Sequence, residues 1–249
     1  FNYKKYLYYQ KIYYLLEIDK IEIISNKSNI FYRVKNVING YLLKFKNYDY
    51  LLAFIIGNDD YLNSKMVSNY QVLGTSHLFA ISGSNIILFA QCLIFIFKKL
   101  KITENKRYYL VMLFLIFFCF LTNFSASVIR ASLFFSLLSL NKIFYTNIKT
   151  INIYLLTLTI LIFINPNILY DLGAQYSFVT SLGLILFSDK LNNKNYFVSL
   201  IKISFIAFLF SLPISAINFY ELNFLSIVNN LILVPLISLV VSPASLIVM

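Results

Sequence analysis

The sequence predicts an all-α polytopic membrane protein with about seven transmembrane or re-entrant helices, some of them broken or kinked. Hydrophobic residues make up 59% of the 249 residues and charged residues only 12%, about half the charged share of soluble domains. Residues 66–97 contain no charged side chain, and residues 108–141, 150–188 and 203–249 contain one each. Runs of this length match a bilayer and exclude a soluble globular domain.

Charged or helix-breaking residues divide the membrane region into seven segments. These cover residues 73–97, 108–122, 126–141, 150–165, 172–188, 203–220 and 224–248. Several are short for a hydrocarbon core of about 30 Å. The turn at 123–125 fits either two crossings or a re-entrant hairpin, and the sequence leaves both open.

Basic residues in the loops predict the orientation. Loops 98–107, 142–149 and 189–202 hold ten Lys or Arg, whereas loops 123–125, 166–171 and 221–224 hold none. Because cytoplasmic loops are rich in Lys and Arg, the first set is expected in the cytoplasm. Seven crossings of the cytoplasmic membrane then place residues 1 to about 70 outside, which requires an upstream transmembrane segment. We therefore expect the chain to be part of a longer protein, truncated at its C-terminus as well.

The first fifty residues are expected to lie outside the membrane core. Residues 1–29 are polar and Tyr-rich, and the alternation of Ile21 and Ile23 with charged neighbours predicts a short strand, compatible with the end of a small β domain. Over residues 30–48 the apolar positions take helical spacing. This amphipathic helix either lies on the bilayer surface or packs on an extracytoplasmic domain. Residues 50–249 are expected to form the polytopic membrane domain.

A polar cluster interrupts the first apolar run, where Ser82, Gly83 and Asn85 follow His77. Broken helices occur at membrane depth only where protein or a water-filled cavity covers the freed backbone. These four residues are therefore candidates for lining a polar path. A helix-packing face of small, weakly polar residues is the alternative.

Arg130 stands alone in a segment that is otherwise uncharged for about thirty residues. An Arg at such depth costs about 3 kcal/mol on insertion scales, so its side chain should face a partner or water. Extension of the side chain toward the Asn123 end of the segment is the alternative.

Asp171 begins the next polar group. Its carboxylate is placed to cap the following helix, because the helix dipole favours a negative charge there, and Gly173 lies in the first turn. Gln175 and Ser177 lie deeper in the segment and are candidates for lining a polar path.

Two prolines predict kinks in the last two segments. Pro213 lies within one of them, and Pro235 follows Asn230 in the other. Kinks create cavities, although ordinary membrane bundles contain them too. With one histidine and two cysteines in apolar runs, no metal site, cofactor or catalytic cluster is expected.

Several motifs in order resemble the ComEC-type competence family over roughly residues 50–249. They are Gly57-Asn58-Asp59, His77-Leu78-Phe79-Ala80-Ile81-Ser82-Gly83, Ser127-Val128-Ile129-Arg130-Ala131, Asn165-Pro166 followed by Asp171-Leu172-Gly173-Ala174-Gln175-Tyr176-Ser177-Phe178, and Asn230 with Val234-Pro235-Leu236. The order of these motifs is far more specific than any one of them alone.

The resemblance implies a channel that imports single-stranded DNA across the cytoplasmic membrane during competence. It also implies an external DNA receptor and a cytoplasmic motor ATPase as partners, and a homo-oligomer is compatible with it. The alternatives are a small-anion transporter, a non-transporting remnant of such a channel, and an intramembrane enzyme using His77 with Ser82. The enzyme lacks a third group to orient the pair.

Overall fold

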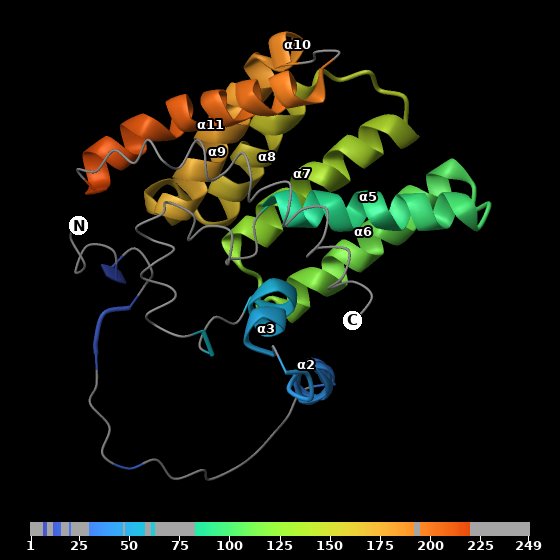
Figure 1. Cartoon of the computed structure of the whole chain (residues 1–249), viewed down its shortest axis with the longest axis vertical. Helices are drawn as coiled ribbons and strands as arrows, with labels where there is room; N and C mark the ends of the chain where they lie inside the picture. The colour runs from blue at the N-terminus through green and yellow to red at the C-terminus, as the bar shows by residue number, and fades with distance from the viewer. Residues whose placement is uncertain are drawn as a thin grey trace.

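A computed structural model describes residues 7–8, 12–15, 20, 30–46, 48–57, 61–62, 83–191 and 195–219 of the chain. Every regular element within these ranges is helical, which confirms the predicted all-α class for them (Figure 1). The elements are α2 (Ile30–Leu42), α3 (Tyr48–Ile56), α5 (Gly83–Lys99), α6 (Glu104–Leu121), α7 (Ala126–Ile143), α8 (Thr150–Ile164), the 3-10 helix η2 (Pro166–Tyr170), α9 (Leu172–Leu186), α10 (Ser188–Leu191) and α11 (Tyr196–Phe219).

Two described helices are long and apolar enough to cross a membrane, by length and composition. They cover Ala126–Ile143 and Phe197–Asn218. Two shorter apolar helices, Thr150–Ile164 and Leu172–Leu186, are 15 residues each and so span only about 22 Å at the α-helical rise. The predicted strand around residues 21–23, the first half of segment 73–97 and all of segment 224–248 lie outside the described residues.

Three helix boundaries differ from the sequence prediction by four residues or more. Helix α6 begins at Glu104 and α11 at Tyr196, earlier than the predicted 108 and 203, because charged residues end an apolar run without ending a helix. Helix α2 ends at Leu42, whereas the amphipathic helix was predicted to end at residue 48. A turn at residues 43–46 separates it from α3.

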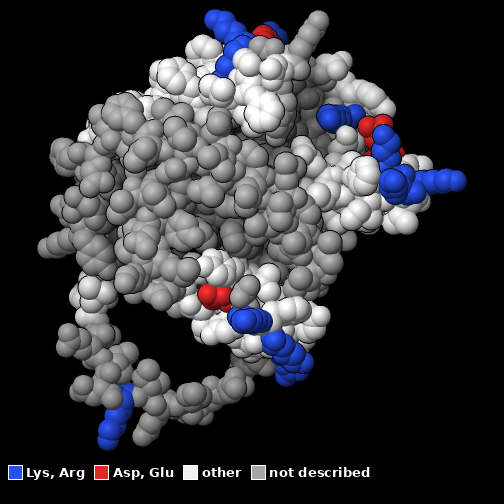
Figure 2. All heavy atoms as spheres, viewed as in Figure 1, with Lys and Arg blue, Asp and Glu red and all other residues white. Residues whose placement is uncertain are grey.

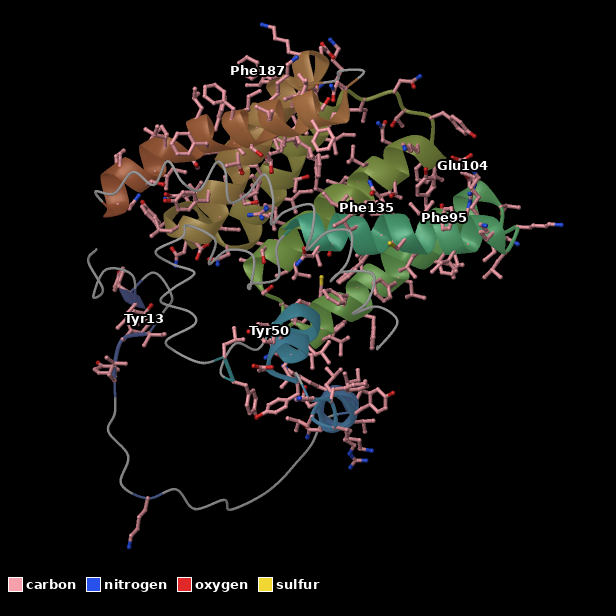
Figure 3. The ribbon with its side chains drawn as sticks, viewed as in Figure 1. Tyr13, Tyr50, Phe95, Glu104, Phe135 and Phe187 are labelled. Carbon is pink, nitrogen blue, oxygen red and sulfur yellow. The ribbon has the colours of Figure 1, made fainter. Side chains whose placement is uncertain are left out.

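Helix α7 lies between two groups of helices (Figure 1). Toward α5 and α6 it contributes Val128 and Ala131 to the largest apolar core, and Phe135, labelled in Figure 3, packs against the same cluster. Toward α8 and α9 it presents Ile129 and Leu133. An α-helix that is buried on two faces can carry a polar side chain between them, away from lipid and water.

Helix α11 packs mainly on α9. A Cβ atom added to Gly183 of α9 would lie 2.6 Å from ring atoms of Phe210, so the absence of a side chain permits this close approach. The hydroxyls of Tyr176 and Ser215 form a hydrogen bond of 2.9 Å between the two helices. Pro213 lies inside α11.

The outward faces of the helices remain apolar. The exposed side chains include Leu113 and Ile116 of α6, Phe163 of α8, and Phe205 and Ile217 of α11. Helices that are apolar on both the inner and outer face are typical of a lipid environment, since water would favour polar side chains on the outside.

The basic side chains gather at the ends of helices. Figure 2 shows them over the end where α5 meets α6, over α10, and around α2 and α3, while residues that the structure does not describe cover the middle of this view. Lys98 and Lys99 end α5, Lys142 lies in the last turn of α7, and Lys190 lies in α10.

Candidate functional site: a buried guanidinium between helices

Arg130 is almost completely enclosed, with 7% of its surface exposed. It lies one turn into α7, next to Ile129, which faces the core of α8 and α9, and to Ala131, which faces α5 and α6. The side chain therefore emerges between the two helix groups and does not extend to the surface.

Two structural features contact the guanidinium directly. Its Cζ atom lies 5.2 Å from the centre of the Phe178 ring of α9, a cation–π arrangement. A Cβ atom on Gly83, the first residue of α5, would lie 3.7 Å from Nη2 and 3.5 Å from the Ala131 methyl. The start of α5 and the face of Phe178 thus enclose the group from two different helices.

Tyr154 of α8 fixes the position of Phe178. Its hydroxyl donates a hydrogen bond of 2.5 Å to the Phe178 carbonyl, and its ring packs edge-on against Phe134 at 6.2 Å and Phe178 at 5.8 Å between centres. Tyr154 and Asp171 also lie within electrostatic range of Arg130. The aromatic ring under the cation is therefore held by packing and by a hydrogen bond.

The Nη1 atom of Arg130 is buried and has no hydrogen-bond partner among the residues that the structure describes. Leaving a buried donor unpaired costs about 1–3 kcal/mol, and more for a charged group. A guanidinium with an unused N–H edge is suited to bind an oxyanion such as a phosphate. The arrangement can therefore hold one anionic group at depth between the helices.

The start of α9 is held by several hydrogen bonds. Asp171 is the N-cap, and its Oδ1 accepts from the backbone N–H of Ala174 at 2.7 Å. A Cβ on Gly173 would lie 3.3 Å from the same oxygen, which leaves little room for a larger residue. Gln175 donates through Nε2 to the carbonyl of Leu169 at 2.6 Å and so ties α9 to η2.

A family model described as "Competence protein" matches residues 54–249, about four fifths of the chain. The chain belongs to the competence-protein family. It is 30% identical over 252 aligned residues to the "ComE operon protein 3" of Bacillus subtilis (strain 168), an alignment covering 98% of this chain and 32% of that protein. The chain thus spans about a third of the length of that relative. No solved structure matches it.

Within this competence domain, the structure brings together part of the predicted site. Gly83 lies against the guanidinium of Arg130, and Asp171 lies within electrostatic range of it. Asn85, 4% exposed, lies in the first turn of α5, and Ser177 precedes Phe178 in α9. Four predicted lining and kink residues lie outside the described ranges; they are His77, Ser82, Asn230 and Pro235.

Sequence reasoning missed two residues of the competence domain that surround Arg130. Phe178 lies in the quoted motif, but its role depends on the contact between α7 and α9. Tyr154 lies on the buried face of α8 with Thr157 and Leu161. A hydroxyl group on the buried face of a predicted helix was the sequence feature that could have indicated its role. Within the described ranges no three His, Cys, Asp or Glu side chains are grouped to hold a metal ion.

Proposed function

We propose that this chain forms part of a membrane channel that imports single-stranded DNA across the bacterial cytoplasmic membrane during competence. The observation that carries the proposal is the enclosed guanidinium of Arg130, whose Nη1 has no hydrogen-bond partner among the described residues, in a chain that belongs to the competence-protein family. The proposed role is transport and not catalysis.

A polyanion needs a wet or cationic path through the bilayer, because each unneutralised phosphate in hydrocarbon would cost many kcal/mol. Arg130 would bind one phosphate at a time. Bases could stack on the aromatic rings around it whatever their identity. We propose the remaining polar residues as further lining of the path: His77, Ser82, Gly83, Asn85, Gln175, Ser177 and Asn230. Asp171, Gly173, Pro213 and Pro235 would shape it as caps or kinks.

We propose a topology of seven crossings with loops 98–107, 142–149 and 189–202 in the cytoplasm. Residues 1 to about 70 would lie outside, with 1–29 as an extracytoplasmic segment, 30–48 as an amphipathic region and 50–249 as the membrane domain. The support is the charge distribution, since cytoplasmic loops concentrate Lys and Arg. These lysines would also attract the emerging strand.

Cysteine labelling in a background without the two native cysteines tests this topology. A cysteine at Asn167 should react with a membrane-impermeant maleimide in intact protoplasts. A cysteine at Lys142 should react only after the membrane is opened. The opposite pattern would reverse the proposed orientation.

The proposed partners follow from the family and from the chemistry of the path. An external receptor would deliver DNA, a cytoplasmic motor ATPase would supply directional force, and two or more copies of the chain would assemble. Crosslinking in membranes would detect each of these contacts.

Import of labelled DNA into a DNase-protected pool tests the proposed function, in a transformable host whose own channel is replaced by the full-length protein. Arg130→Ala should abolish import at unchanged membrane abundance, and Arg130→Lys should retain part of it, because a lysine keeps the charge without the planar donor edge. Arg33→Ala removes an exposed guanidinium from α2 and should leave import unchanged.

Full import by Arg130→Ala at normal abundance would contradict the proposal. No import by the unaltered protein in a host that supplies every partner would indicate a non-transporting remnant. Saturable uptake of a small anion, blocked by Arg130→Ala while DNA is excluded, would assign the site to a small-anion transporter.

A further inference from the structure

A pocket opens beside the buried guanidinium, at the end of the bundle opposite the lysine-rich loops. Its volume is about 190 Å³, and it lies between the turn that joins α6 to α7, the end of α8 and η2. Pockets for drug-sized ligands are larger, roughly 300–1,000 Å³. The space therefore suits a single small ring system.

The turn on one side of this pocket holds Phe124 in a rare conformation. Its φ is 55°, and that of Asn123 is 51°, in the left-handed region that bulky side chains avoid. The backbone N–H of Phe124 bonds to the carbonyl of Cys119 at 2.8 Å, and its ring packs edge-on against Phe120 at 4.8 Å. This strained turn holds a ring that is 49% exposed at the pocket.

A second ring, that of Tyr170, also lines the pocket. Tyr170 ends η2 and is 53% exposed. Asn165 caps η2 by accepting from the N–H of Asn167 at 3.3 Å, and Gln175 bonds to the carbonyl of Leu169. The backbone that carries each of the two rings is thus held by hydrogen bonds within the fold.

The remaining lining has an apolar part and a polar edge. Ile129 and Leu161 supply apolar surface, while Asn165 and Asp171 supply an amide and a carboxylate. A flat heteroaromatic ring with donors at its edge matches this surface. A phosphate does not, because Asp171 lines the pocket and no Lys or Arg is among its described lining residues to offset that charge. An acyl chain would leave the polar edge without partners.

The pocket lies near the proposed phosphate position. Ile129 of the lining precedes Arg130, and Asp171 of the lining lies within electrostatic range of the guanidinium. We propose that this pocket receives one unstacked nucleobase of the incoming strand between Phe124 and Tyr170, while Arg130 holds a nearby phosphate. This inference rests on the proposed function and adds a base-binding position to it.

Binding of two labelled oligonucleotides to the protein in lipid nanodiscs tests the inference. One carries ten thymines, and the other has the same ten phosphates without bases. The unaltered protein should bind the first at least about fivefold tighter, the lower end of base–aromatic stacking. Phe124→Ala and Tyr170→Ala should each weaken binding of the thymine strand about fivefold and leave the affinity for the abasic strand unchanged.

Conservative and distant variants serve as controls. Phe124→Tyr and Tyr170→Phe keep the rings and should retain the affinity for the base-carrying strand. Phe163→Ala, which removes a ring that is 89% exposed on α8 and outside the pocket, should change neither affinity. Unchanged binding of the abasic strand also shows that the alanine variants remain folded.

Equal affinity of the unaltered protein for both strands would overturn the base pocket, as would alanine variants that weaken both strands alike or neither. If import still depends on Arg130 in that case, the proposed channel stands without this pocket. Native mass spectrometry that finds a bound lipid lost in both alanine variants, with oligonucleotide affinity unchanged, would assign the pocket to an acyl chain and also overturn the inference.

Discussion

Replacing Phe178 with Leu tests whether the ring stabilises the buried charge of Arg130. The guanidinium carbon lies 5.2 Å from the ring centre, and the two residues are 7% and 8% exposed. Cation–π contacts are worth about 0.5–1 kcal/mol at exposed sites and about 2 kcal/mol or more when desolvated. We therefore expect Phe178→Leu to cost about 2 kcal/mol of unfolding free energy from this contact, in addition to lost ring packing.

A double-mutant cycle separates the charge contact from packing. Arg130→Met keeps an extended side chain without the charge, so Phe178→Leu in that background removes only packing. The sum of the two single-mutant changes in unfolding free energy should exceed the change for the double mutant by about 1–2 kcal/mol. Each single substitution removes the contact between Arg130 and Phe178, whereas the double mutant loses it only once. Unfolding by SDS in mixed micelles, followed by circular dichroism, measures all four free energies.

Additivity of the two substitutions would refute this assignment. A coupling below about 0.5 kcal/mol is the level found for independent sites, and it would mean that the ring and the guanidinium do not interact. Coupling of the opposite sign would mean that the ring makes the buried charge less stable. Either result would remove Phe178 from the candidate site and leave Arg130 to be tested by import alone.

Two further predictions concern the helices that hold the site. Gly183→Ala should destabilise the protein by about 1–3 kcal/mol through overpacking, because the new Cβ would lie 2.6 Å from the Phe210 ring, and a second substitution, Phe210→Leu, should relieve part of that cost in the same unfolding assay. Gly40→Ala is the matched control, since nothing lies within 4 Å of its added Cβ, and it should be neutral or slightly stabilising. Asp171→Ala should cost about 1 kcal/mol by removing the N-cap of α9, while Asp171→Asn should cost less because an amide oxygen can still accept the bond; equal costs would contradict the capping role.

The sequence predicted helix α7 closely because its limits coincide with polar turns. Residues 126–141 were expected and Ala126–Ile143 is observed. The start of α6 was missed because Lys106 and Arg107 lie inside that helix. Hydropathy locates the apolar part of a helix, whereas backbone hydrogen bonds continue through charged residues that lie in water. The separate helix α3 was missed because its nine residues carry too little periodicity to be distinguished from the preceding segment.

The candidate site was only partly predictable for a different reason. The isolation of Arg130 in an apolar run is visible in the sequence, because burying a charge is costly wherever the helix packs. Its partners are not visible, since Phe178 is 48 positions away and one of many Phe residues. Choosing among them requires the rotation of α7 against α9, which is set by the side-chain packing of the whole bundle.

The stability cost of Arg130 supports a functional role for it. Ion pairs or charges buried in a protein can often be replaced by apolar residues of similar volume with no loss, or a gain, of stability. Helix α7 already has apolar neighbours on both faces, and methionine or leucine at this position would pack without an unpartnered donor. A guanidinium that is 7% exposed and has no hydrogen-bond partner for Nη1 among the described residues is costly as a packing element alone, even with the contribution of the Phe178 ring. An anion that reaches Nη1 would offset this cost, which is why replacement of Arg130 by methionine, a residue of similar length, should change stability little while it removes transport.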